Sequence, residues 1–96
     1  MTVGVLRVTL RLPENVSLKG KRQVVKSVLE RVRQRYNVSA AEVDQEAWQL
    51  ATLGVSCVSN DDAHARDVLS GVLRYIEGSR LDAEIVDSAI EIERVL

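Results

Sequence analysis

Residues 17–22, with the sequence SLKGKR, carry the residue types that bind anions. Ser17 stands where a helix would begin, and Lys19, Lys21 and Arg22 follow it within about one turn. The start of a helix is already positive, so each cation there costs roughly a few tenths of a kcal/mol. Free backbone N–H groups, a positive helix end and flexible cations together predict an anion site, and Gly20 would let an anion approach the backbone.

The cations continue along the same predicted helix. Residues 19–35 contain seven lysines and arginines and a single acid, whereas the rest of the chain contains six basic and thirteen acidic residues. At about 100° per residue most of the cations form one ridge, with Lys21 on the other flank, nearer the core edge. Such a ridge suits a repeating phosphate backbone better than one small anion. The candidate nucleic-acid or anion-binding residues are Ser17, Lys19, Lys21, Arg22, Lys26 and Arg33.

Two alternative roles for this basic segment stay open. The helix could be an amphipathic, solvated one whose cations offset the acids of the last strand, or it could bind a small anionic ligand. The second predicted helix supports a functional role for the cations of the first, because its own start carries the negative charges that the helix dipole favours. It opens with Ser59, Asn60, Asp61 and Asp62, a polar cap followed by acids.

The hydrophobic pattern predicts six elements that position these residues. Residues 3–12 alternate between apolar and polar, as a half-buried strand does. The same criteria predict strands at 38–43, 48–58 and 83–95 and helices at 18–36 and 61–77. A turn is expected at 44–46, and Asn37 and Gly78 are expected to end the two helices.

This βαββαβ order predicts one ferredoxin-like α+β domain over residues 1–96. Right-handed crossovers place both helices on one face of the sheet. The simplest strand order is 4-1-3-2, with all neighbours antiparallel.

Two short motifs resemble the YlxP-like family of small bacterial proteins of unknown function. SLKGKR at 17–22 is similar to that family's pattern near its first helix, and NVSAAE at 37–42 to the pattern on its following strand. The resemblance implies a ferredoxin-like fold, a cytoplasmic bacterial protein and no known catalytic activity. Genes of the family often lie beside those for translation initiation and ribosome maturation. The resemblance also adds Ser39 and Glu42 to the candidate positions.

No catalytic, metal or cofactor site is predicted. His64 has no second histidine or cysteine partner, and Cys57 shares the face of its strand with apolar residues, which indicates a buried thiol. The glycines are scattered rather than gathered in a phosphate-binding loop. Acids of the second helix and the last strand are expected to be capping or solvated groups.

The sheet face that the helices leave open offers an alternative function. It is expected to carry seven apolar side chains: Val3, Val5, Trp48, Leu50, Val58, Ile85 and Ala89. Trp48 is its only aromatic residue, so bases are not expected to stack on this face. A second copy of the chain would cover it, with the last strand as a further edge for pairing. A homodimeric ligand-binding or structural module is therefore the competing prediction.

The bulk composition agrees with a small cytosolic protein. The formal net charge is −1, one cysteine excludes an internal disulfide, and no apolar run approaches the roughly 20 residues of a membrane helix. The sequence thus predicts a non-enzymatic, cytoplasmic accessory protein without cofactors, associated with RNA or the ribosome through its basic first helix.

Overall fold

The structure, a computed structural model, describes residues 1–44, 49–79 and 83–96. Its elements follow the order β1 (Thr2–Arg11), α1 (Leu18–Arg35), β2 (Ser39–Asp44), β3 (Leu50–Ser59), α2 (Asp62–Gly78) and β4 (Glu84–Arg94). The predicted turn at 44–46 and Trp48 fall largely outside the described residues. This order is the predicted βαββαβ.

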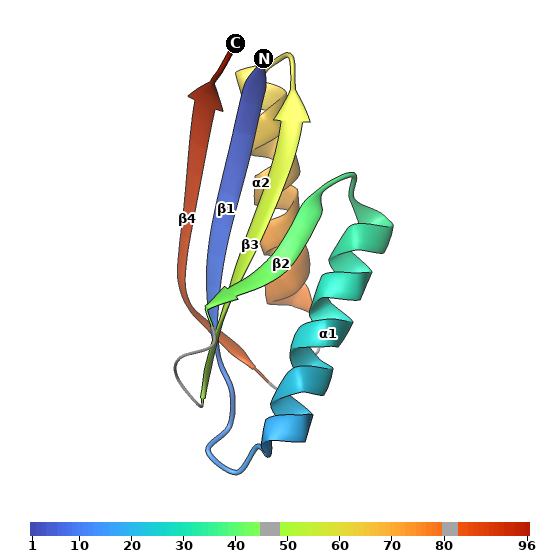
Figure 1. Cartoon of the computed structure of the whole chain (residues 1–96), viewed down its shortest axis with the longest axis vertical. Coiled ribbons are helices and arrows are strands. Elements are labelled where there is room, and N and C mark those ends of the chain that lie inside the picture. The colour runs from blue at the N-terminus through green and yellow to red at the C-terminus, as the bar shows by residue number, and fades with distance from the viewer. Residues whose placement is uncertain (45–48, 80–82) are drawn as a thin grey trace.

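The four strands form one antiparallel sheet with the order β2-β3-β1-β4, which is the predicted order read from the other edge. In Figure 1, α2 lies behind the central strands and α1 runs alongside β2. Strands β2 and β4 are therefore the two edges, and α1 and β4 lie on opposite sides of the molecule. The ferredoxin-like α+β fold is confirmed.

The core lies between the sheet and the helices. Alternate residues of β1, namely Leu6, Val8 and Leu10, are at most 1% exposed and form one cluster with buried residues of both helices. Both helices thus cover the same face. At the start of α1 the apolar side chain of Leu18 is 45% exposed, whereas Lys21 is buried.

The end of α1 differs from the prediction, whereas α2 ends at Gly78 as predicted. Tyr36 caps α1 in an extended conformation, and its N–H donates to the carbonyl of Val32. Ser79 caps α2 in the same way, and its hydroxyl also donates to the carbonyl of Tyr75. Asn37 does not have a positive φ, so its predicted role as the left-handed end of α1 is wrong.

A register shift changes the face of one predicted open-face residue. Strand β4 pairs Asp87 with Thr9 but Ile85 with Leu10, so Val86 is an extra residue between them. Because residues directly opposite each other share a face, Ile85 points with Leu10 toward the core. The placement of Ile85 on the open face was therefore wrong, since strict alternation cannot foresee a bulge.

Asp62 joins three elements where α2 begins. It accepts hydrogen bonds from the hydroxyl of Thr2 at 2.6 Å and from Nε of Arg94 at 3.0 Å. The Thr2 hydrogen bond, followed by that of Arg94, holds the pKa of this carboxyl below its ordinary value of 3.8. The carboxylate links β1 and β4 to the start of α2, where the helix dipole also favours a negative charge.

Replacing Asp62 with Asn should therefore lower stability in a pH-dependent way. The folded-state pKa is depressed, so the ionised carboxylate stabilises the fold above pH 3.8 and this contribution disappears as the pH falls through the folded pKa. Melting temperatures between about pH 6 and about pH 2 should show a gap between the wild type and Asp62→Asn that closes at the acid end. The control is Asp67→Asn, an exposed acid on the same helix; a gap of constant size would contradict the prediction.

Candidate nucleic-acid interface

The first turn of α1 uses most of the amides that the anion hypothesis required to be free. The Ser17 side chain accepts a hydrogen bond from the N–H of Gly20 at 2.9 Å. The N–H of Lys21 donates to the carbonyl of Ser17, also at 2.9 Å. Ser17 is thus the predicted N-cap, but the expectation of free amides at Gly20 and Lys21 is wrong. An anion site built on the backbone of this turn is not supported.

Gly20 is explained by packing around this cap. A Cβ atom at this position would lie 3.1 Å from Cγ2 of Val16 and 3.2 Å from Oγ of Ser17. Both distances are tighter than ordinary side-chain contacts, so a larger residue would press on the capping hydroxyl. The absence of a side chain serves the local structure, and the cations around it need a separate explanation.

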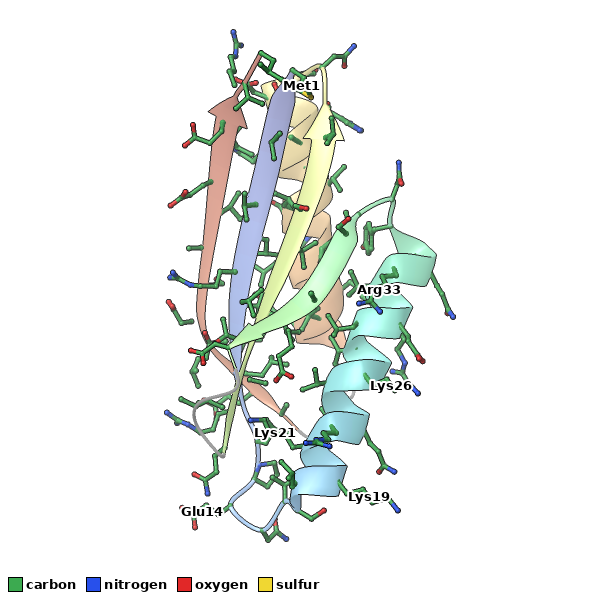
Figure 2. The ribbon with its side chains drawn as sticks, in the orientation of Figure 1. Met1, Glu14, Lys19, Lys21, Lys26 and Arg33 are labelled. Carbon is green, nitrogen blue, oxygen red and sulfur yellow. The ribbon has the colours of Figure 1, made fainter. Side chains whose placement is uncertain are left out.

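Three cations of α1 form an exposed surface, here named the basic flank: Lys19, Arg22 and Lys26. Figure 2 shows Lys19 and Lys26 projecting from the side of α1 that faces away from the sheet. Nζ of Lys26 lies 3.9 Å from Oε1 of Glu30. The two side chains are 77% and 52% exposed, so this ion pair contributes little to stability. Within the described chain, no ion pair engages Lys19 or Arg22. The first turn of α1 also contains no acid.

The basic flank surrounds a shallow, mainly apolar hollow of about 490 Å³. Its lining residues are Leu18, Lys19, Arg22, Gln23 and Lys26. The half-exposed Leu18 and the aliphatic stems of the cations supply the apolar floor, while their charged ends lie around it. The surface therefore combines positive charge with a flat apolar area.

Arg33 is engaged by the fold. Its Nε donates to the carbonyl of Ala40 at 3.1 Å, and its Nη2 donates to the same oxygen. Ala40 lies on β2, an edge strand whose outward carbonyls lack a strand partner, so Arg33 caps this edge. The structure thus separates Arg33 from the basic flank, although both lie on α1.

Lys21 is 6% exposed and lies on the side of α1 that faces the sheet (Figure 2). It lines a cavity of about 200 Å³ between α1 and β2, together with Leu18, Arg22, Val25 and Glu42. Its flank was predicted correctly, but its ammonium group does not belong to the exposed surface.

Glu42 brings the second sequence motif to the same cavity. It pairs with Leu53 of β3, whose side chain is buried, so Glu42 points to the helix side of the sheet. Its Oε2 atom is buried and has no hydrogen-bond donor in the described part of the chain. Ser39, the other candidate of this motif, pairs with Ser56 and lies on the open face. The structure therefore brings Arg22 and Glu42 together and leaves Ser39 apart.

The acids of β4 lie at the far edge of the sheet. Asp87 pairs with Arg7 of β1 at 3.3 Å, and Arg94 of β4 pairs with Asp62 at 3.0 Å. Among the residues that the structure describes, no ion pair joins the basic flank to β4. The basic flank and the acids of β4 are thus separated in space, which disfavours charge balance between them as the purpose of the flank.

The open face of the sheet exposes apolar side chains. Val5, Val43 and Val58 are 41%, 60% and 71% exposed. A shallow apolar groove of about 300 Å³ runs over β2 and β3 on this side and includes Val5 and Val43. Ile85 does not contribute to this face, and Trp48 lies outside the described residues.

The remaining candidates show no reactive arrangement. The thiol of Cys57 is buried and donates weakly to the carbonyl of Ala65 at 3.8 Å. In residues 1–44, 49–79 and 83–96, no group of three histidine, cysteine or acidic side chains is placed to hold a metal ion. Over the same ranges, no helix has the length and apolar character needed to cross a membrane.

Comparisons with known proteins match nearly the whole chain. A family model described as "Protein of unknown function (DUF503)" matches residues 3–90. The uncharacterized protein YlxP of Bacillus subtilis (strain 168) is 37% identical over 81 residues, which cover 83% of this chain and 77% of that protein. The de novo designed protein Ferredog-Diesel aligns with 98% of this chain and 85% of its own, at a TM-score of 0.41 and 12% identity.

Proposed function

This chain belongs to the DUF503 family, whose description assigns no activity, and we propose from its own surface that it is a non-enzymatic accessory protein that binds RNA, free or within the ribosome. The binding surface is the basic flank of α1. The observation that carries the proposal is the set of exposed cations at a helix start whose dipole already disfavours them.

Two further features support RNA as the partner. The cations extend along the helix instead of converging on one point, and phosphates repeat along a strand in the same way. The apolar hollow between them offers an area on which a base or a sugar can lie, as in proteins that bind single strands. The resemblance to proteins encoded beside ribosome-maturation genes agrees with this partner.

The proposal predicts a binding affinity that falls steeply with salt. A labelled single-stranded RNA should bind, and the logarithm of the association constant should fall against the logarithm of the salt concentration. The slope should be roughly −2, or about −0.7 for each of three phosphate contacts. Fluorescence anisotropy over about 50 to 300 mM salt would measure it. Binding that does not depend on salt, or no binding at low salt, would contradict the proposal.

A second candidate is a homodimer formed through the open face, which the exposure of Val43 and Val58 favours. Pairing two β4 edges is less suitable, because antiparallel pairing would bring their acids, Asp87, Glu91 and Glu93, close to one another. Sedimentation at micromolar concentration should give twice the monomer mass of 10.7 kDa, and Val58→Asp should return the protein to the monomer. A wild-type protein that sediments as a monomer would exclude this candidate.

A further inference from the structure

We propose that the cavity between α1 and β2 binds one guanine base of the RNA and that Glu42 is the group that distinguishes this base. The inference rests on the proposed function, because the base belongs to a strand whose phosphates lie on the basic flank. It adds a sequence preference that phosphate contacts alone cannot supply.

The first support is the unsatisfied carboxylate oxygen. Oε2 of Glu42 is buried, and no described residue donates a hydrogen bond to it. A buried acceptor without a donor is unfavourable and uncommon in folded proteins. The oxygen belongs to a residue that lines an open cavity, so a bound group can supply the missing donor. The cavity therefore calls for a ligand that presents N–H or O–H groups.

The second support is the presence of a cation in the same cavity as this carboxylate. Arg22 lines the same cavity as Glu42. Guanine presents N1–H and its 2-amino group side by side, which matches the two oxygens of a carboxylate. It also presents O6 and N7 as neighbouring acceptors, which are common partners of arginine. Adenine, cytosine and uracil each place an acceptor beside their N–H donor, and this acceptor would face the carboxylate unfavourably.

The third support is the size and the position of the cavity. Its volume of about 200 Å³ lies below the roughly 300 to 1,000 Å³ typical of pockets that enclose a whole small molecule. It suits one flat group, and Leu18 and Val25 are the apolar side chains of its lining. Leu18 and Arg22 also border the hollow of the basic flank. A strand held on Lys19 and Lys26 can therefore turn a single base past Arg22 into the cavity.

The test uses the chain of residues 1–96 and fluorescein-labelled hexauridine. One central position is uridine, guanosine, inosine, adenosine or cytidine, and anisotropy measures each affinity at low salt. Guanosine should bind about tenfold more tightly than uridine, in the range of one good base contact. Inosine lacks only the 2-amino group and should lose most of this gain. Adenosine and cytidine should bind like uridine.

Two matched variants locate the preference. Glu42→Gln replaces one oxygen with an amide donor, so it should abolish the preference for guanosine and retain hexauridine binding. Lys26→Gln should weaken all oligonucleotides by a similar factor and retain the preference. Equal binding of all oligonucleotides by the wild type, or an unchanged preference in Glu42→Gln, would overturn the guanine site and leave RNA binding intact. No binding of any oligonucleotide would overturn both proposals. If Glu42→Gln does not fold, the comparison of guanosine with inosine on the wild type tests the guanine site: equal binding of the two would overturn it.

Discussion

Replacing Lys19 and Arg22 together with glutamate should abolish RNA binding without weakening the fold. The change removes two of the three cations of the basic flank and adds two negative charges that repel phosphate. Each lost phosphate contact should reduce the salt dependence of log affinity by roughly 0.7 to 0.9. Anisotropy at about 0.1 M salt should then detect no binding, while the wild type still binds.

The stability of this double variant should move in the opposite direction. Lys19 lies in the first turn of α1, where the helix dipole favours an acid by roughly 0.3 to 1 kcal/mol, and Arg22 follows at the start of the second turn, where this effect is weaker. Within the described chain neither Lys19 nor Arg22 forms an ion pair, so their replacement breaks none. The melting temperature should therefore stay level or rise as binding disappears.

A matched control separates the surface from the net charge. Arg11→Glu with Arg74→Glu makes the same change of charge at two exposed positions outside α1. This control should retain most of the affinity. A Lys19→Glu and Arg22→Glu protein that melts at a lower temperature and binds RNA as before would show instead that the cations serve the fold.

The fold could be predicted from the spacing of the hydrophobic residues and from the order of the helices and strands. The alternation of β1 and the stripes on both helices placed every element within two residues of its observed bounds. The right-handed crossovers predicted that both helices cover one face, and the strand order was the simplest one for the βαββαβ pattern. The resemblance to the YlxP-like family is confirmed by the family model and by the relative from Bacillus subtilis.

The site could be predicted only in part, because its remaining features depend on tertiary contacts. The exposure of Lys19, Arg22 and Lys26 follows from helix geometry. Sequence period alone does not show that Arg33 binds the edge carbonyl of Ala40. One feature of the sequence could have indicated the cavity beside Glu42. Glu42 lies two positions after Ala40, so in a strand both side chains point to the same face, and Ala40 is buried against the helices.

Gly4 should be among the positions of the sheet that tolerate substitution least. It lies on the core side of β1, and a Cβ atom there would stand 2.7 Å from Cδ1 of Leu69 and 3.3 Å from both Sγ of Cys57 and Cδ1 of Ile92. Leu69 is completely buried on α2 and has little room to move. This close approach lets α2 pack directly on the sheet.

A double-mutant cycle between Gly4 and Leu69 should show that this contact is the cause. Gly4→Ala should lower the free energy of unfolding by about 1 to 3 kcal/mol through overpacking, reduced slightly by the lower entropy of the unfolded chain. Leu69→Ala should cost about 2 to 5 kcal/mol through the cavity that it leaves. In the double variant the new methyl group enters space that Leu69 has vacated. Urea unfolding should then show a loss smaller than the sum by about 0.5 to 3 kcal/mol.

The control cycle pairs Gly4→Ala with Val25→Ala on α1, whose side chain is buried near β2 rather than against Gly4. Those two losses should add within about 0.5 kcal/mol. Additive losses for Gly4 and Leu69 as well would show that the contacts with Cys57 and Ile92, instead of the contact with Leu69, limit this position. Since Gly4 and Leu69 lie away from α1, each variant that still folds should bind RNA like the wild type. The cycle thereby tests whether the placement of α2 and the binding surface of α1 are independent parts of this small domain.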